Sequence, residues 1–179
     1  MFTPADVLEF WFSDAAQPHW FARNDAFDAL IRRKFAVLYE HVRDGAHAGW
    51  KDSPRGLLAL VIVLDQFPRN MFRESPQAFA SDDLALMLAE LGIAKGFNVQ
   101  LSQRERMFLY MPLQHAEKLD VQEQSVARFA ELDMAEPLDF ARQHRDIIAR
   151  FGRFPHRNAV LARISTAEET EFLKTHHGF

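Results

Sequence analysis

The stretch that most constrains the fold reads LLALVIVLDQFPRN and occupies residues 57–70. It begins with eight consecutive apolar residues and then turns abruptly polar, with Asp65 and Arg69 among the polar residues. A helix that is apolar on every side has no face for solvent, so this one should lie buried at the centre of the fold. A second segment, RFPHRN at 153–158, repeats the pattern of QFPRN at 66–70. We therefore expect these two segments to frame any functional site.

Helix start and stop signals divide the chain into seven or eight helices. N-cap and proline signals open the first three, and capping boxes, Ser102 with Glu105 and Thr166 with Glu169, open two later ones. Short connections favour antiparallel helical hairpins, and no strand is predicted, because a cap precedes the apolar run and no partner strand is found. The sequence thus predicts one all-α domain over residues 1–179. The expected helices cover residues 4–12, 25–44, 54–67, 79–96, 103–132, 137–151 and 167 onward.

Two prolines are expected to shape these helices. Pro68 should end the central helix, because proline favours a non-helical residue before it and cannot donate a backbone hydrogen bond. Pro112 lies inside the helix that starts at 103, so we expect a kink or break there, with helix continuing to about Leu132.

Composition excludes several classes of protein. The chain has no cysteine, which rules out disulfides, thiolate metal sites and cysteine nucleophiles. Its net charge of −4 gives no electrostatic footprint for nucleic acid or an anionic membrane. No apolar run approaches the roughly 20 residues of a membrane span, and the N-terminus lacks the basic region of a signal peptide. We expect a cytoplasmic protein with no nucleic-acid or membrane partner. Phosphate-binding and dinucleotide-binding loops are also absent from the sequence.

Polar residues at buried positions mark the candidate site. His144 lies on the apolar stripe of its helix, and His115 and Gln122 point inward if helix resumes after the internal proline. Asp65, at a helix C-terminus, is at the unfavourable end of the helix dipole and needs a cation or hydrogen-bond donors. Three arginines of the two framing segments are candidates for this role: Arg69, Arg153 and Arg157.

This polar group supports a structural and a functional interpretation. In the first, carboxylates and arginines fasten loops to helix ends, and His144 is a core histidine that donates to a backbone carbonyl. In the second, the arginines bind an anionic ligand while His115, paired with Glu117, transfers protons. No metal or cofactor is predicted, because His115 and Glu117 are two positions apart and would face different sides of a helix.

Several segments together resemble one family. They read LALVIVLDQFPRNMFR, FASDDLAL, FLYMPLQHAEKLDVQEQSV and HRDIIARFGRFPHRN, and with VLEFWF and STAEETEFL they resemble the bacterial family of unknown function 924 (DUF924). The resemblance covers essentially the whole chain. It implies a tetratricopeptide-like right-handed array of antiparallel helix pairs, and no assigned activity. Ala116 stands where the family usually has serine, which argues against an essential serine nucleophile; Val121 and Ala162 also depart from the family pattern.

Two functional hypotheses follow. The preferred one is a tetratricopeptide-like binding module for a protein, a peptide or a small anionic ligand, whose motif arginines line an open concave groove. The alternative is a small-molecule enzyme with a closed pocket that performs acid–base chemistry. A purely structural role and a homo-oligomer formed through Trp20 or Trp50 stay open. The catalytic candidates are His115 and Glu117, and the ligand-binding candidates are Asp65, Arg69, Asn70, His144, Arg153, His156 and Arg157.

Overall fold

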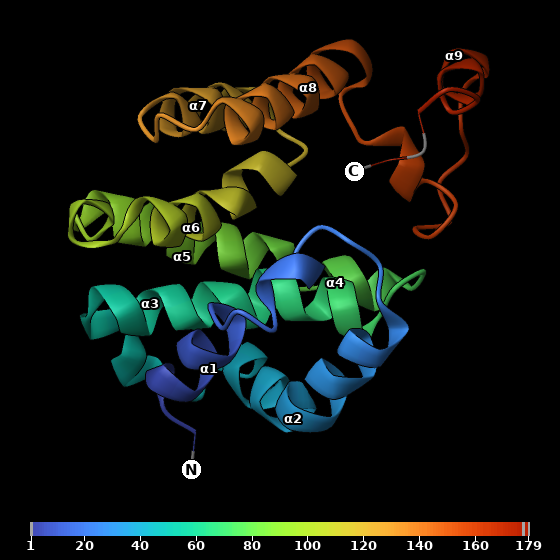
Figure 1. Cartoon of the computed structure of the whole chain (residues 1–179). Coiled ribbons are helices and arrows are strands. Elements are labelled where there is room, and N and C mark those ends of the chain that lie inside the picture. The colour runs from blue at the N-terminus through green and yellow to red at the C-terminus, as the bar shows by residue number, and fades with distance from the viewer. Residues whose placement is uncertain (1, 177, 179) are drawn as a thin grey trace.

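Stacked layers of helices build the protein (Figure 1). The computed structural model describes residues 2–176 and 178, and every regular element in this part of the chain is helical. The helices are α1 (Pro4–Trp11), α2 (Asp25–Arg43), α3 (Pro54–Val61), α4 (Phe67–Met71), α5 (Asp82–Ala94), α6 (Gln103–His115), α7 (Leu119–Ala130), α8 (Ala135–Phe151) and α9 (Ala167–Phe172). One π-helical turn joins α3 and α4 into a single helix, so the described chain holds eight helices and the all-α prediction is confirmed.

The layers follow the order of the chain. In Figure 1, α1 and α2 lie below the helix formed by α3 and α4, and α5 and α6 lie above it. The helices α7 and α8 form the layer at the top of the view. Sequential neighbours pack together, as in α5 with α6, α6 with α7 and α7 with α8. The tetratricopeptide-like superhelix remains an expectation from the resemblance. None of the helices in the described residues is both long enough and apolar enough to cross a membrane.

The central position of the apolar helix is confirmed. Every side chain from Leu57 to Leu64 is at most 2% exposed, and α1, α5 and α6 all pack against α3. Gly92 permits the close approach of α5, because a Cβ atom at this position would lie 2.8 Å from Leu57 Cδ2. Trp20 and Trp50 are partly buried against the same core. The polar end of the helix is therefore held in the interior by tight packing on all sides.

The prediction that Pro68 ends the central helix is wrong. The chain forms a π-helical turn at Ile62–Gln66, in which Phe67 N donates to Ile62 O, and it continues as α-helix to Met71. Proline removes one backbone donor, but the Ser81 hydroxyl donates to Leu64 O at 2.6 Å and replaces it. A side chain from a distant part of the chain thus satisfies the carbonyl.

The expected break at Pro112 is displaced. The helix α6 passes through Pro112 and ends at His115, and a short link at 116–118 separates it from α7. The Gln122 side chain, inward as predicted, donates to Gln114 O at 2.7 Å and to Ala116 O at 2.8 Å. These bonds supply donors at the end of α6, so the reversal falls here and not at the proline.

Four local start signals, at Asn24, Ser53, Ser102 and Thr166, were read correctly, whereas the helix expected from 137 begins two residues earlier, at Ala135. Asn24 and Ser53 cap α2 and α3 through hydrogen bonds to backbone N–H groups, and capping boxes open α6 and α9. Gly152 ends α8 in the left-handed conformation with φ 70°. The fourth expected helix starts three residues later than predicted, because Ser81 lies at its N-cap and Asp82 is its first residue.

Candidate functional site

The fully buried carboxylate of Asp65 lies at the centre of the candidate site. Its Oδ1 atom is 2.7 Å from His115 Nδ1 and 3.2 Å from Arg69 Nη1, and Gln66 Nε2 donates to Oδ2 at 2.6 Å. Burial alone would raise the pKa of Asp65, but the charge of Arg69 and the bond with His115 lower it well below 3.8. The expectation that Asp65 requires a cation is confirmed for Arg69.

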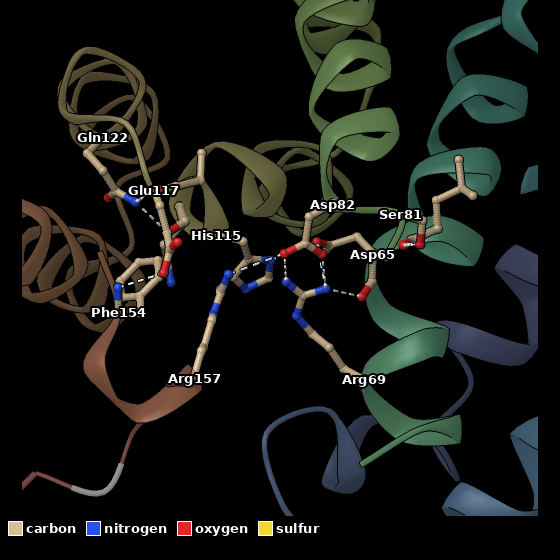
Figure 2. A network of polar contacts seen from close by, with 12 residues as sticks. Asp65, Arg69, Ser81, Asp82, His115, Glu117, Gln122, Phe154 and Arg157 are labelled. Carbon is tan, nitrogen blue, oxygen red and sulfur yellow. Dashed lines mark hydrogen bonds and ion pairs between the residues drawn. The ribbon is translucent and has the colours of Figure 1, made fainter. Parts of the chain in front are cut away.

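Asp82 connects the two framing segments, as Figure 2 shows. Arg69 donates to both its oxygens, at 2.9 and 3.0 Å, and Arg157 Nη1 donates to Oδ2 at 3.3 Å. Asp82 is the first residue of α5, where the helix dipole favours a carboxylate. Asp82 was not among the predicted site residues. Its signal was the acidic pair after Ser81, at a helix start that we placed three residues too early.

Arg157 is buried but poorly bonded. Its side chain is only 8% exposed, and its guanidinium lies between two rings, 4.6 Å from the centroid of Phe79 and 4.5 Å from that of Phe154. Among the described residues, no acceptor bonds its Nε atom. Desolvation, together with the nearby charge of Arg69, lowers the pKa of Arg157 to about 10, so it stays protonated at neutral pH.

The expected pairing of His115 with Glu117 is wrong. Glu117 accepts hydrogen bonds from Phe154 N at 2.7 Å and from Arg163 at 2.6 and 3.0 Å. Because α6 ends at His115, Glu117 lies in the link and turns toward the C-terminal segment (Figure 2). Burial would raise the pKa of Glu117, but its bond with Arg163 lowers it. Glu117 therefore anchors the turn that carries Arg157.

His115 is paired with Asp65 instead. An ionised carboxylate only accepts hydrogen bonds, so His115 Nδ1 carries the proton and Nε2 is the acceptor of the ring. Desolvation and the charge of Arg69 lower the pKa of His115, which keeps the ring neutral at pH 7. The arrangement can accept a proton at Nε2, and Asp65 would stabilise the resulting imidazolium.

Two predicted site residues, Asn70 and Arg153, lie in other structural contacts. Asn70 donates to Asp28 at 2.8 Å, and this carboxylate is also bound by Arg73. Arg153 binds Glu169 at 2.6 Å and therefore fastens α9. These contacts match the structural interpretation, and the structure does not bring the three motif arginines together.

Two further predicted site residues, His144 and His156, are largely buried and have low pKa values. His144 Nδ1 bonds Phe140 O at 2.8 Å, as expected of a core histidine, and its ring centroid is 6.3 Å from that of His115. Desolvation lowers the pKa of His144 to about 2. Desolvation, with the nearby charge of Arg157, lowers that of His156 to about 4.

A pocket of about 310 Å³ opens beside His115 and Arg157. It lies between α5, the end of α6 and the C-terminal segment. Its charged lining comprises Asp82, Asp83, Glu117, Lys118 and Arg157, and its apolar lining includes Pro76, Phe79, Leu86, Pro112 and Leu161. Asp65 and Arg69 support this wall from behind. The described residues hold no group of three or more His, Asp or Glu side chains arranged to bind a metal ion.

Comparison with known proteins identifies related chains without a described activity. A family model described as "Bacterial protein of unknown function (DUF924)" matches residues 7–177. A solved structure of a protein of unknown function from Agrobacterium tumefaciens has 37% sequence identity, a TM-score of 0.91 and 96% coverage of both chains. No curated protein matches the chain.

Proposed function

We propose a function for this chain, which belongs to the bacterial family of unknown function DUF924: it binds a small molecule whose anionic group docks on Arg157. The observation that carries the proposal is the buried Nε atom of Arg157, which has no acceptor among the described residues although its side chain lines a pocket. The ligand occupies the 310 Å³ pocket beside His115.

The side chain of Arg157 is bonded much less completely than that of Arg69. A buried donor without a partner costs about 1–3 kcal/mol, more for a charged group. Within the described residues, the Arg157 side chain makes one hydrogen bond, at 3.3 Å, whereas Arg69 donates to both oxygens of Asp82 and also to Asp65 O at 2.6 Å. A carboxylate or phosphate can accept two parallel hydrogen bonds from a guanidinium. Such a ligand would supply the missing acceptor.

The positions of the motif arginines favour a small molecule over a peptide. A groove that clamps a peptide carboxylate with Arg69, Arg153 and Arg157 needs all three along one surface. Only Arg157 lines the pocket, while Arg153 is engaged with Glu169. This argues for a compact ligand that contacts one arginine.

Binding of simple anions tests the proposal. Acetate and inorganic phosphate at millimolar concentration should raise the melting temperature of the wild-type protein. Arg157→Met should weaken binding at least about tenfold, because loss of one charge-assisted hydrogen bond is worth about 1.5 kcal/mol or more.

The matched control is Arg153→Met, which removes an arginine of the same segment outside the pocket and should leave binding unchanged. Equal binding by wild type and Arg157→Met would contradict the proposal, as would the absence of binding by every anion in wild type.

A second candidate function is acid–base catalysis on the same ligand. The observation that favours it is the 2.7 Å contact between His115 Nδ1 and Asp65, which leaves Nε2 as a base on a pocket-lining residue. Nuclear magnetic resonance spectra of bound ligands, followed over time in D₂O, test it. Conversion or deuterium incorporation that His115→Asn abolishes without loss of binding supports catalysis. A ligand that binds and never changes rejects it.

A further inference from the structure

We propose that the ligand is a zwitterion with an apolar side chain, an amino acid of small or medium size, with its carboxylate at Arg157 and its ammonium group at Asp83. This inference rests on the proposed function and specifies its ligand. The charges around the pocket, their partners and the size of the cavity carry it.

The acidic and basic groups around the pocket balance. The ionised side chains that line the pocket, together with the arginines bonded to them and the Asp65 carboxylate behind them, form four acidic and four basic groups. They are Asp65, Asp82, Asp83 and Glu117 on one side and Arg69, Arg157, Arg163 and Lys118 on the other. His115 is neutral at pH 7. The site therefore matches a ligand without net charge, since an added anion would carry one uncompensated charge into a partly buried site.

Two of the charged side chains that line the pocket, Asp83 and Lys118, are not paired with another side chain of the described residues. Glu117 is bound by Arg163, and Asp82 is clamped by Arg69 and Arg157. Within the described residues, the exposed side chains of Asp83 and Lys118 line the same pocket and have no ion-pair or hydrogen-bond partner. One is an anion and the other a cation.

Each charge of the ligand has a matching group in the pocket: Arg157 and Lys118 for the carboxylate, and Asp83 for the ammonium group. The Arg157 guanidinium, on a pocket-lining side chain 8% exposed, supplies donors for a carboxylate, and Lys118 supplies the accompanying positive charge. Asp83 supplies the acceptor for an ammonium group. Figure 2 shows Arg157 and the Asp82 carboxylate next to His115, so the docked carboxylate would lie close to this ring.

The size and polarity of the pocket also constrain the ligand. Pockets that bind drug-sized molecules have volumes of about 300–1,000 Å³, and this one, at 310 Å³, is at the lower limit. Apolar residues, among them Leu86, Pro112 and Leu161, complete the wall. They provide a surface for an aliphatic or aromatic side chain, and the volume suits one amino acid.

Three compounds that share the isobutyl group of leucine test the inference. L-leucine carries both charges, isocaproate lacks the ammonium group and isoamylamine lacks the carboxylate. We expect calorimetry on the wild-type protein to give an affinity for leucine at least about tenfold above that for either analogue, since each lost charge-assisted contact is worth about 1.5 kcal/mol or more.

Variants then assign each charge to its contact. Asp83→Asn should remove the advantage of leucine over isocaproate, and Arg157→Met its advantage over isoamylamine. Glu90→Gln changes an exposed carboxylate of the same helix away from the pocket and serves as the matched control, with no expected change. Circular dichroism melts verify that each variant is folded.

The outcomes separate the two proposals. If isocaproate binds as tightly as leucine and Arg157→Met abolishes its binding, the zwitterion inference is wrong and the anion-binding function stands. If none of the three compounds, acetate or phosphate binds the wild-type protein, both fail. A leucine advantage that survives Asp83→Asn also overturns the inference.

Discussion

The two framing segments contain the same ordered elements, phenylalanine and proline followed by arginine and asparagine, at 67–70 and 154–158. Their arginines, Arg69 and Arg157, bind the same carboxylate, Asp82, and lie over the same ring, with guanidinium carbons 5.8 and 4.6 Å from the Phe79 centroid. The segments differ in how far these groups are satisfied. Arg69 has acceptors from Asp65 and Asp82, whereas Arg157 keeps a buried nitrogen that has no acceptor in the described part of the chain.

This difference teaches how to separate a structural arginine from a ligand-binding one. Motif membership does not distinguish Arg69 from Arg157, and burial alone would mislead, because the Arg157 side chain is the more buried of the two, at 8% against 20% exposed. The number of hydrogen bonds distinguishes them, because a fully bonded guanidinium gains little from a ligand and a partly bonded one gains an acceptor. We expect Arg69 to determine the stability of the fold and Arg157 to determine its binding.

The largest expected effect tests this distinction directly. Arg69→Met should lower the free energy of unfolding by about 3–5 kcal/mol, because it leaves the buried Asp65 without its main cation. Arg157→Met should change it by less than about 1 kcal/mol, because removal of a desolvated, weakly bonded charge has offsetting effects. Urea denaturation followed by circular dichroism measures both. Similar losses in the two variants would remove the difference between the segments.

The second framing segment should make the free energy of unfolding more sensitive to acid than the first. The second segment contains an extra residue, His156, whose pKa is lowered to about 4, and the neighbouring His144 has a pKa of about 2. Below pH 6.5 the unfolded chain binds protons at these positions and the folded chain does not, so stability is lost as the pH falls. Each histidine contributes up to about 1.4 kcal/mol per pH unit, or about 2 kcal/mol at pH 5.

The variant His144→Gln tests this assignment between pH 6 and 5, and the titration of Asp65 at lower pH provides a contrast. His144→Gln should reduce the slope of stability against pH between 6 and 5 by about one proton, measured by urea denaturation across this range. Asp65, whose folded pKa is depressed, contributes stability that is present above pH 3.8 and is lost only below it. An unchanged slope in His144→Gln would contradict the assignment.

The prolines of the two segments offer a smaller test. Pro68 lies inside a helix because Ser81 donates to Leu64 O, whereas Pro155 begins a short 3-10 turn at Pro155–Arg157. Ser81→Ala should destabilise the protein by about 1–2 kcal/mol by leaving a buried acceptor unpaired. In the Pro68→Ala background the cost should be smaller, because the restored backbone N–H can bond this carbonyl. Additive effects in a double-mutant cycle would show that the hydroxyl does not replace the missing donor.

The smallest effect is expected for Arg153. Its ion pair with Glu169 fastens α9, and Thr166 N also donates to Glu169 at 2.7 Å. Arg153→Met also leaves a buried carboxylate, Glu169, without its cation, but α9 is a terminal helix that can open locally. The variant should therefore change the free energy of global unfolding by less than about 1 kcal/mol and accelerate amide hydrogen exchange in α9 alone. Accelerated exchange in α3 or α6 would show that this arginine supports the core.

Local signals predicted the helices well. Caps such as Asn24 and Ser53 and the terminator Gly152 act through bonds within a few residues, so their effect is written in the adjacent sequence. The effects of Pro68 and Pro112 were misjudged because their compensation is not local. Ser81 is 17 residues from Leu64, and the end of α6 is set by Gln122 of the next helix.

The membership of the site was predicted better than its pairing. The prediction that Asp65 requires a cation or donors rested on its position at a helix C-terminus, and this position was wrong because the helix continues to Met71. The requirement holds because the carboxylate is buried, and Arg69 is the one of the three candidate arginines that pairs with it. The partners of His115 and Glu117 depend on where α6 ends, and that position was wrong in the prediction. Asp82 could be identified only after α5 began at the right residue, because its role depends on two arginines 13 and 75 positions away.

The π-helical turn at Ile62–Gln66 sets the rotational phase of the polar end of the central helix. A turn with one residue more than an α-helical turn shifts all later side chains by about 100°, the angle between consecutive residues of an α-helix. Deletion of one residue from this turn would restore the regular period and leave the apolar half in place. Arg69 and Asn70 would then face away from Asp82 and Asp28. The length of this single turn therefore fixes which side of the helix faces the pocket, so the chain should tolerate substitutions there far better than deletions.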